Sequence, residues 1–592
     1  MHIPIKSLLI GMLACSALVA CTNEELLENN EIENGKDQVE QSYISVKLVN
    51  PVAKSRAFQD GDDNEQQVSR ARFYLFNADN TAYEISDDTD NVNYVDANQT
   101  DLKPTYNSGS NNFETICQAV LVIDKSKKQP PTSIVAVLNY PLNDDGECVW
   151  GDGAKSLDDL KNATLAYNHG TIKSGASSYN TSGNFVMTNS VYVDGTNTVM
   201  EATPIAPENI CVTSGAEDAT GALNHPVEIY VERIAAKVEA SMSNEFTPAT
   251  DNSGTYTIKA MTFNQINENG ESEEVTVNAR VLGWKVTNIT EKSYLIKHLT
   301  NSYRTFNDHT GAATSWTWND AGNFRSYWAN TSDLSTPTHP WTFNEVTNNF
   351  DEANNWEYYN ENTHPSIHSQ LLVVAQFEVE GEPTPIAEWY GVKYTYAGLQ
   401  TAIANALKKK VYTRTGAEGN YEYTSVTPAE ITFEQVSHDL GAERYWAEAK
   451  LTGTPSTYYN ENQVAYTKET LATLLKTIQH AKIWGNYVTT GEGDAAQRTV
   501  VGGGYYYVDI IQNAGTVTRN EEGTVTSDAN IYGLVRNHWY QLTLNGLSGL
   551  GTPVYDPEKI IKTEKPDGDE SYIAAEINVL AWNIKQQSVT LE

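Results

Sequence analysis

Tyr43-Ile44-Ser45-Val46-Lys47-Leu48-Val49 is the clearest strand signal in this sequence, and it ends at an Asn50-Pro51 break. Ile44, Val46 and Leu48 fall on one side of an extended chain, because successive side chains of a strand point to opposite faces. The alternation predicts a strand that buries one face in a core.

Similar runs of β-branched and aromatic residues recur downstream, separated by clusters of Asn, Asp, Gly and Ser. They are Ala71–Phe76, Ala119–Ile123, Ile134–Leu138, Val191–Val193, Val227–Val231, Thr255–Phe263 and Trp539–Leu547. Helical spacing of apolar residues is confined to Tyr396–Lys410 and Lys468–Ile483. We therefore expect an all-β protein of β-sandwiches with long loops and a few short helices.

The segment ahead of the first strand has the pattern of a lipoprotein signal peptide. Lys6 precedes an apolar run from Leu8 to Val19, and Leu18-Val19-Ala20-Cys21 closes it. The run is shorter than the roughly 20 residues that a membrane-spanning helix needs. We expect cleavage before Cys21 and lipidation of that cysteine, followed by a polar tether from Thr22 to Gln41.

The Arg56-Ala57 bond follows the first strand in a polar, loop-like setting that suits an arginine-specific protease. A cut there removes the lipid, the tether and the strand Tyr43 to Val49 together. If that strand belongs to a sheet, its loss leaves unpaired backbone groups beside an apolar groove. Arg70 and Arg72 are alternative cleavage sites, but they lie in or beside the next predicted strand.

A second strand that could detach lies at the C-terminus, after a charged linker from Asp556 to Glu570. Ile573, Ala575, Ile577 and Val579 alternate there. Burying three large aliphatic side chains at about 1.5 to 3 kcal/mol each provides roughly 5 to 9 kcal/mol before ordering costs. A groove at one end and a strand at the other generate an open filament. The alternative is that each terminal strand completes its own domain.

Length and net charge indicate the number of domains and argue against a nucleic-acid-binding protein. The chain has 592 residues, which fits two large domains, and a net charge of -36. So acidic a chain is not expected to bind nucleic acid, because phosphates require a basic surface. Cys15 is removed with the signal peptide. The three other cysteines do not have the spacing of metal ligands, and they allow either one disulfide or three buried free thiols; they are Cys117, Cys148 and Cys211.

The sequence predicts no catalytic residues, no metal site and no cofactor. Pro365 argues against a metal-binding helix in His364-Pro365-Ser366-Ile367-His368, so we expect a surface loop. Gly502-Gly503-Gly504 precedes a strand, not the helix that a phosphate site needs, and is interpreted as a bulge or tight turn. A cluster of aromatic residues has two interpretations. We favour packing in a core or subunit interface, and the alternative is a surface that binds a sugar. The cluster consists of Trp316, Trp318, Phe324, Tyr327 and Trp328.

Several motifs, taken in order with the lipobox, resemble the Mfa-like family of fimbrial subunits, the shaft proteins of type V pili. They are Ser42–Leu48 with Ser55-Arg56-Ala57, Val231–Lys237, Val535–Tyr540 with Gly549-Leu550-Gly551, and Ile577–Trp582 through Val589 and Leu591.

The resemblance implies two transthyretin-like β-sandwich domains and a maturation pathway. The implied parts are a signal peptide (1–20), a lipidated propeptide with the first strand (21–56), an N-terminal domain (57–245), a C-terminal domain (246–555), and a linker with the donor strand (556–592). Cleavage after Arg56 leaves 536 residues with a net charge of -34. The implied donor residues are Ile573, Ala575, Ile577, Val579, Leu580 and Trp582.

The same resemblance implies partners and a location. Identical subunits would join head to tail by donor-strand exchange, with anchor and accessory subunits, and the fibres would serve adhesion, aggregation and biofilm formation. The precursor would sit in the outer membrane through a transient lipid anchor until an arginine-specific protease releases it to the extracellular fimbrium. The rival interpretations are an accessory or tip subunit, and a surface glycan-binding lipoprotein retained through Cys21.

Overall fold

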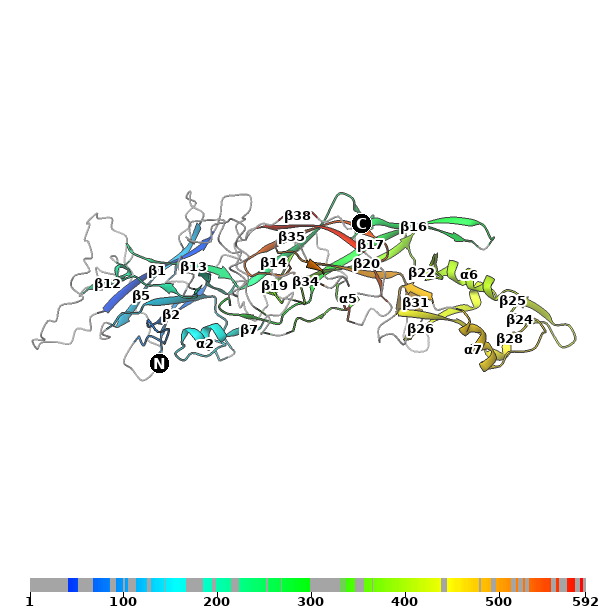
Figure 1. The fold of residues 1–592 in the computed structure, drawn as a ribbon, viewed down its shortest axis with the longest axis horizontal. Coiled ribbons are helices and arrows are strands. Elements are labelled where there is room, and N and C mark those ends of the chain that lie inside the picture. The colour runs from blue at the N-terminus through cyan, green and yellow to red at the C-terminus, as the bar shows by residue number, and fades with distance from the viewer. Residues whose placement is uncertain are drawn as a thin grey trace, which may run out of the picture.

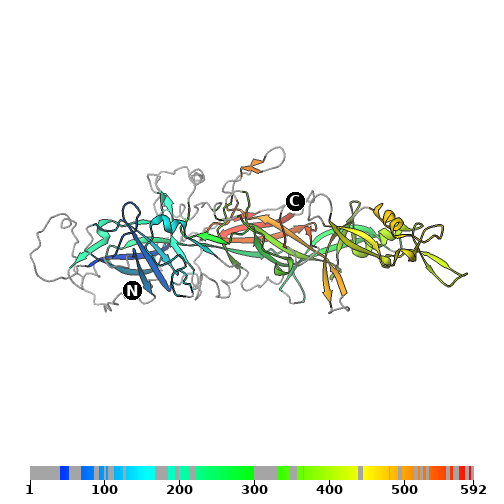
Figure 2. The ribbon, with the colours of Figure 1, turned by 90° about the horizontal axis from the view of Figure 1, so that it is seen from below.

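The computed structural model describes residues between 41 and 588, apart from internal segments of which the longest are 52–67, 167–184 and 299–330. The described residues form a rod of three bodies in a row (Figures 1 and 2). An N-terminal body lies at one end, a middle body follows, and a distal lobe forms the other end. Strands make up most of the regular structure, which confirms the predicted all-β fold.

The N-terminal body is built on strands ordered β3-β2-β6-β8-β13-β1-β5-β4, with β11 beside β6 and β12 beside β1. The strands are β1 (Gln41–Pro51), β2 (Arg70–Phe76), β3 (Tyr94–Asn98), β4 (Lys103–Pro104), β5 (Phe113–Asp124), β6 (Ser133–Leu138), β8 (Met187–Asn189), β11 (Thr203–Pro204), β12 (Ile210–Thr213) and β13 (Val227–Arg233). Helix α2 (Leu157–Asn162) and the pairs β9 (Tyr192–Val193) with β10 (Val199–Met200) and β7 (Thr164–Ala166) with β18 (Lys292–Tyr294) complete it.

The middle body contains two larger sheets. One has the order β19-β14-β35-β37-β38, and the other β15-β16-β17-β20-β32-β36 with β21 beside β20. The bounds are β14 (Ala235–Met242), β15 (Thr247–Pro248), β16 (Tyr256–Ile266), β17 (Ser272–Thr287), β19 (Trp356–Asn360), β20 (Gln370–Val379), β21 (Glu382–Pro383), β32 (Gly503–Asp509), β35 (Trp539–Ser548), β36 (Thr552–Pro553), β37 (Tyr572–Leu580) and β38 (Gln586–Ser588). Leu542 and Leu544 of one sheet share a core with Val281 and Val373 of the other, so the sheets form a sandwich.

Smaller elements border the middle body: helix α5 (Phe343–Val346) and the hairpins β30 (Asn486–Thr490) with β31 (Gln497–Val501) and β33 (Thr518–Arg519) with β34 (Val525–Ser527). The chain passes from the N-terminal to the middle body at Ile234. Although β13 and β14 are consecutive, β13 pairs with β1 and β8, whereas β14 pairs with β19 and β35.

The distal lobe is an insertion between β21 and β32 with its own hydrophobic core. Its elements are β22 (Ile386–Trp389), β23 (Val392–Thr395), α6 (Tyr396–Leu407), β24 (Tyr412–Thr415), β25 (Glu422–Ser425), β26 (Ile431–Ser437), β27 (Tyr445–Leu451), β28 (Tyr458–Tyr459), α7 (Lys468–Lys476) and β29 (Ala481–Trp484). The indole of Trp484 donates to the carbonyl of Gly551 at 2.7 Å and so attaches the lobe to the middle body.

Two local predictions are wrong. The helix expected over Lys468–Ile483 ends at Lys476, because Ala481–Trp484 forms β29 between β22 and β27. Gly503 and Gly504 lie inside β32 and not in a turn or bulge. A Cβ on Gly504 would lie 2.4 Å from the carbonyl oxygen of Leu550, so close backbone packing explains the glycine.

Candidate assembly site at the first strand

The first strand is an interior strand of the N-terminal body. β1 pairs antiparallel with β5 along its whole length, from Gln41 opposite Asp124 to Pro51 opposite Phe113. On its other side, Val46 to Val49 pair in parallel with Val227 to Tyr230 of β13. Figure 1 shows β1 among β5, β12 and β13. Removal of β1 from this fold would therefore open backbone edges on both sides.

The described apolar side chains predicted to face the core from β1 are buried, but the strand is not buried on that face alone as expected. Ile44 and Val46 are fully buried and belong to the core of the N-terminal body, with Leu121 of β5 and Ile229 of β13. Ser45 is also fully buried, so both faces of the strand are covered at this point. Leu48 pairs with Cys117 and Ile229 through the backbone, and its side chain lies outside the described residues.

Burial of Ile44 and Val46 stabilises the chain by about 3 to 6 kcal/mol in total, before the ordering of the strand is subtracted. Backbone pairing on two sides adds to this. A replacement strand would have to present aliphatic side chains at the same alternate positions and a small one at the position of Ser45.

Several predicted site residues lie outside the described residues. These are the lipidation residue Cys21, the proposed scissile residues Arg56 and Ala57, and the aromatic cluster Trp316 to Trp328. Within the described ranges, no helix has the length and apolar character needed to cross a bilayer.

Arg72, one alternative cleavage site, is only 2% exposed. Its guanidinium donates to Asp96 at 2.7 and 2.9 Å and to Asp152 at 2.7 Å. Burial lowers the pKa of Arg72, but the hydrogen bonds and charge of these carboxylates outweigh it and raise the pKa above its ordinary value. Arg70 begins the same paired strand, and its carbonyl accepts from the amide of Asn139 at 2.8 Å. A protease would have to unfold β2 to reach either bond.

The C-terminal strand is part of a sheet in its own chain. β37 pairs antiparallel with β35, from Trp539 opposite Leu580 to Ser548 opposite Tyr572, and β38 covers its other edge. Ile573, Ala575, Ile577, Val579 and Leu580 lie in β37, but their side chains and the whole of Trp582 lie outside the described residues. In the single chain, both terminal strands therefore complete sheets of their own.

Two of the sequence motifs meet where the N-terminal and middle bodies join. Lys237 of β14 is paired with Trp539 of β35, and its ammonium lies 4.1 Å from that indole and 4.6 Å from that of Trp356. The backbone N–H of Asn537 donates to the carbonyl of Ala235 at 2.8 Å. The motifs Val231–Lys237 and Val535–Tyr540 are therefore two halves of one junction.

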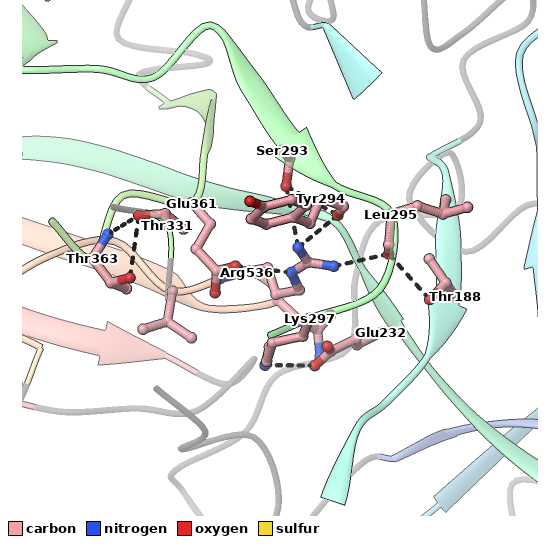
Figure 3. A network of polar contacts seen from close by, with 12 residues as sticks. Thr188, Glu232, Ser293, Tyr294, Leu295, Lys297, Thr331, Glu361, Thr363 and Arg536 are labelled. Atoms are coloured by element: carbon pink, nitrogen blue, oxygen red, sulfur yellow. Dashed lines mark hydrogen bonds and ion pairs between the residues drawn. The ribbon is translucent and has the colours of Figure 1, made fainter. Parts of the chain in front are cut away.

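Buried charged side chains attach residues 293–297, which begin within β18, to this junction (Figure 3). Arg536 donates to a carboxylate oxygen of Glu361 at 3.1 Å and to the carbonyls of Tyr294 and Leu295 at 2.7 and 3.1 Å. Lys297 donates to Glu232 at 3.0 Å, and both side chains are at most 1% exposed. Burial raises the pKa of Glu232, and the charge of Lys297 opposes that rise.

Sequence reasoning did not single out these charged residues as a network. Their side chain types occur mostly on surfaces, and Arg536, Glu361 and Lys297 are far apart in the chain. The resemblance carried by the two motifs pointed to Glu232 and Arg536 alone, and no signal in the sequence pointed to Lys297 or Glu361.

The structure places both histidines of the predicted loop and one of the three cysteines, whereas the side chains of Cys117 and Cys211 lie outside the described residues. His364 accepts hydrogen bonds from the amides of Ser366 and Ile367, and the ring of His368 stacks on Tyr532 at 4.8 Å, in a non-helical segment as expected. Among the described residues, no group of three His, Cys, Asp or Glu side chains is arranged to hold a metal ion. Cys148 is buried and free, and burial raises the pKa of its thiol to about 11.

Comparison with known proteins identifies one part of the chain. Residues 499–588 match the family model for the C-terminal region of the major fimbrial subunit protein type IV, fimbrillin. This segment includes β32, β35 and β37. The match confirms, for this region, the resemblance to fimbrial subunits. Among curated proteins, none matches the sequence.

Solved structures of fimbrial proteins are also similar over long stretches. A fimbrilin from Porphyromonas gingivalis W83 is 11% identical, with 93% of this chain and 99% of that chain covered and a TM-score of 0.29. A fimbrial assembly protein from Parabacteroides distasonis is 13% identical, with 60% and 86% covered and a TM-score of 0.27. The tip fimbrial protein Mfa3 of P. gingivalis is 10% identical, with 90% and 99% covered and a TM-score of 0.26. Scores this low carry no inference about function.

Proposed function

We propose that this chain, whose residues 499–588 match the fimbrillin C-terminal family, is a structural subunit of a surface fimbria. It is exported as a lipoprotein through Cys21, cut after Arg56 and joined to neighbouring copies by its C-terminal strand. No catalytic role is assigned to any residue. Because the chain has both a removable first strand and a C-terminal strand, a position in the shaft is preferred to an accessory or tip position.

The observation that carries this proposal is the place of β1 in the sheet. An interior strand with fully buried Ile44 and Val46 leaves an apolar groove between β5 and β13 when it departs. β37 offers alternating aliphatic residues of suitable size. A propeptide that ended before β1, or a β1 at the sheet edge, would offer no such groove.

A peptide-binding experiment tests the strand addition directly. A peptide of residues 571–592 is added to the protein that begins at Ala57 and lacks its own residues 571–592, and to the same protein that keeps residues 41–56. The edge of β35 that β37 covers is vacant in both forms. We therefore expect the trimmed form to bind one peptide more than the other, because β1 occupies the groove in the untrimmed form. An Ile577→Asp peptide is the control, since a charge at a buried alternate position should abolish binding. Equal binding to both protein forms would contradict the proposal.

Deletion of residues 571–592 from the full chain gives the complementary result. β35 keeps its parallel partner β14, so we expect a folded monomer that cannot polymerise. Circular dichroism checks the fold and electron microscopy looks for fibres. Long fibres from this variant would refute the donor role of β37.

A further inference from the structure

The distal lobe differs from the rest of the chain in its charge. Residues 386–484 contain ten basic and ten acidic side chains, so the lobe contributes nothing to the net charge of -36. In contrast, residues 57–240, which form most of the N-terminal body, contain 27 acidic and 11 basic side chains. The neutral lobe and this acidic body lie at opposite ends of the rod (Figure 1).

An arginine held by tyrosines lies on the small sheet β25-β24-β28 of the lobe. The guanidinium carbon of Arg414 is 4.1 Å from the ring centre of Tyr421 and 4.7 Å from that of Tyr459. Tyr423 meets the ring of Tyr459 edge-on at 5.3 Å. Tyr421 is 40% exposed and Arg414 is exposed, so this face is open to solvent in the single chain.

The charge of this face is not neutralised within the part of the chain that the structure describes. No hydrogen bond or ion pair there engages the guanidinium of Arg414, which lies against the two tyrosine rings. Exposed Lys408, Lys409 and Lys410 follow α6 and lead directly into β24. Residues 408–425 contain four basic and two acidic side chains, a local excess of +2 in a strongly acidic protein.

We infer that this face, defined by Lys408 to Lys410, Arg414, Tyr421 and Tyr423, docks onto the acidic N-terminal body of the next copy of the chain. The inference rests on the proposed function, because head-to-tail addition brings opposite ends of two rods together. It adds a second contact between neighbours beside the donated strand.

Electrostatics favour this partner. Mature subunits with a charge of -34 repel one another, and the repulsion is smallest where one of the two surfaces is neutral or basic. At physiological salt, interactions between exposed charges are largely screened beyond about 8 Å. The positive charges of the lysines and Arg414 therefore determine the electrostatic interaction of this face, because the acidic bodies are too far away to contribute. Tyrosine and arginine are also the side chains enriched at the energetic centres of protein interfaces.

The acceptor surface has exposed carboxylates in the described part of the N-terminal body. Asp145 and Glu147 lie in one exposed turn, and Asp158 and Asp159 lie in the first turn of α2. These groups are the expected partners of the lysines.

Zero-length cross-linking with a carbodiimide tests the contact, using an equal mixture of ¹⁵N-labelled and unlabelled mature protein. We expect heavy-to-light links from Lys408 to Lys410 to carboxylates of residues 57–240. An Arg414→Glu variant, which keeps all three lysine amines that react, should lower their yield about fivefold, as expected when an exposed attraction becomes a repulsion. Lys259→Glu, which makes the same change of charge at an exposed lysine outside the lobe, should leave the yield unchanged.

Absence of these links, or links from the lysines to the middle body alone, would overturn the inference whether or not fibres form. Electron microscopy of the same sample reports on the proposed function separately. Fibres without the links would support strand addition and refute the lobe contact. Links without fibres would support the lobe contact and refute strand addition.

Discussion

Lys297→Met is the substitution that best tests the buried junction. Lys297 and Glu232 are at most 1% exposed and 3.0 Å apart, and Lys297 lies in the segment that Arg536 holds through Tyr294 and Leu295. Removing the ammonium leaves a carboxylate in the core of the N-terminal body without its counter-ion.

The expected loss is about 3 to 5 kcal/mol, because breaking a buried ion pair strands the remaining charge. For a unit of 150 to 250 residues this lowers the melting temperature by about 6 to 20 °C. A Glu232→Leu/Lys297→Met double variant should lie within about 2 kcal/mol of the unchanged protein, since no charge is then left buried.

The loss should also depend on pH. Burial already raises the pKa of Glu232, and loss of Lys297 removes the charge that opposes this rise. A carboxyl whose folded pKa is raised binds more protons in the folded state, so the stability of Lys297→Met should fall as pH rises above the ordinary range of a glutamate.

Urea unfolding followed by circular dichroism at pH 5 and pH 8 measures these effects. Lys292→Met, on the same segment but exposed, is the control and should change little. An unchanged midpoint for Lys297→Met, or a double variant as unstable as the single one, would refute the reasoning about the buried charge.

Three further outcomes are expected, the first from the proposed maturation and the other two from the fold. Arg56→Ala should accumulate lipidated, unassembled precursor, measured by mass spectrometry of membrane fractions; continued assembly would move the cut to Arg70, Arg72 or another site. Ile44→Ala should destabilise the precursor by about 2 to 5 kcal/mol, because Ile44 is fully buried in β1. Lys47→Ala, at a partly exposed position of the same strand, should change the melting temperature little, and equal shifts for the two variants would contradict this. Burial lowers the pKa of Lys482 to about 8, so its folded state binds fewer protons between about pH 8 and 10.5, and stability should rise with pH in that window. Lys482→Met should remove this contribution of Lys482 to the rise in stability, which is on the order of 3 kcal/mol. Thermal unfolding of the variant and of the unchanged protein across this pH range measures it, and identical pH profiles for the two proteins would contradict the prediction.

Local patterns predicted individual strands well. The alternation of Ile44 and Val46 and the aliphatic run Ile134–Leu138 lie in β1 and β6, because a buried face imposes a period of two. The prediction that the helix continues beyond Lys476 was wrong because residues there form β29, which pairs with β22 and β27. The helical spacing of apolar residues contains no information about such distant partners.

Long-range features were not predictable in the same way. A buried pair such as Arg536 with Glu361 looks like two surface residues in a sequence, since its stabilisation depends on packing of segments 175 residues apart. The division into domains at 57–245, 246–555 and 556–592 stays a prediction, and the separate core of the distal lobe had no counterpart in it.

The mature N-terminus tests the central claim most directly. Mass spectrometry of the protein sheared from the cell surface should give a chain that begins at Ala57 and has no acyl group, because a subunit joined through its groove has lost β1. A surface protein that still begins at lipidated Cys21 would contradict the account and favour a lipoprotein retained at the membrane.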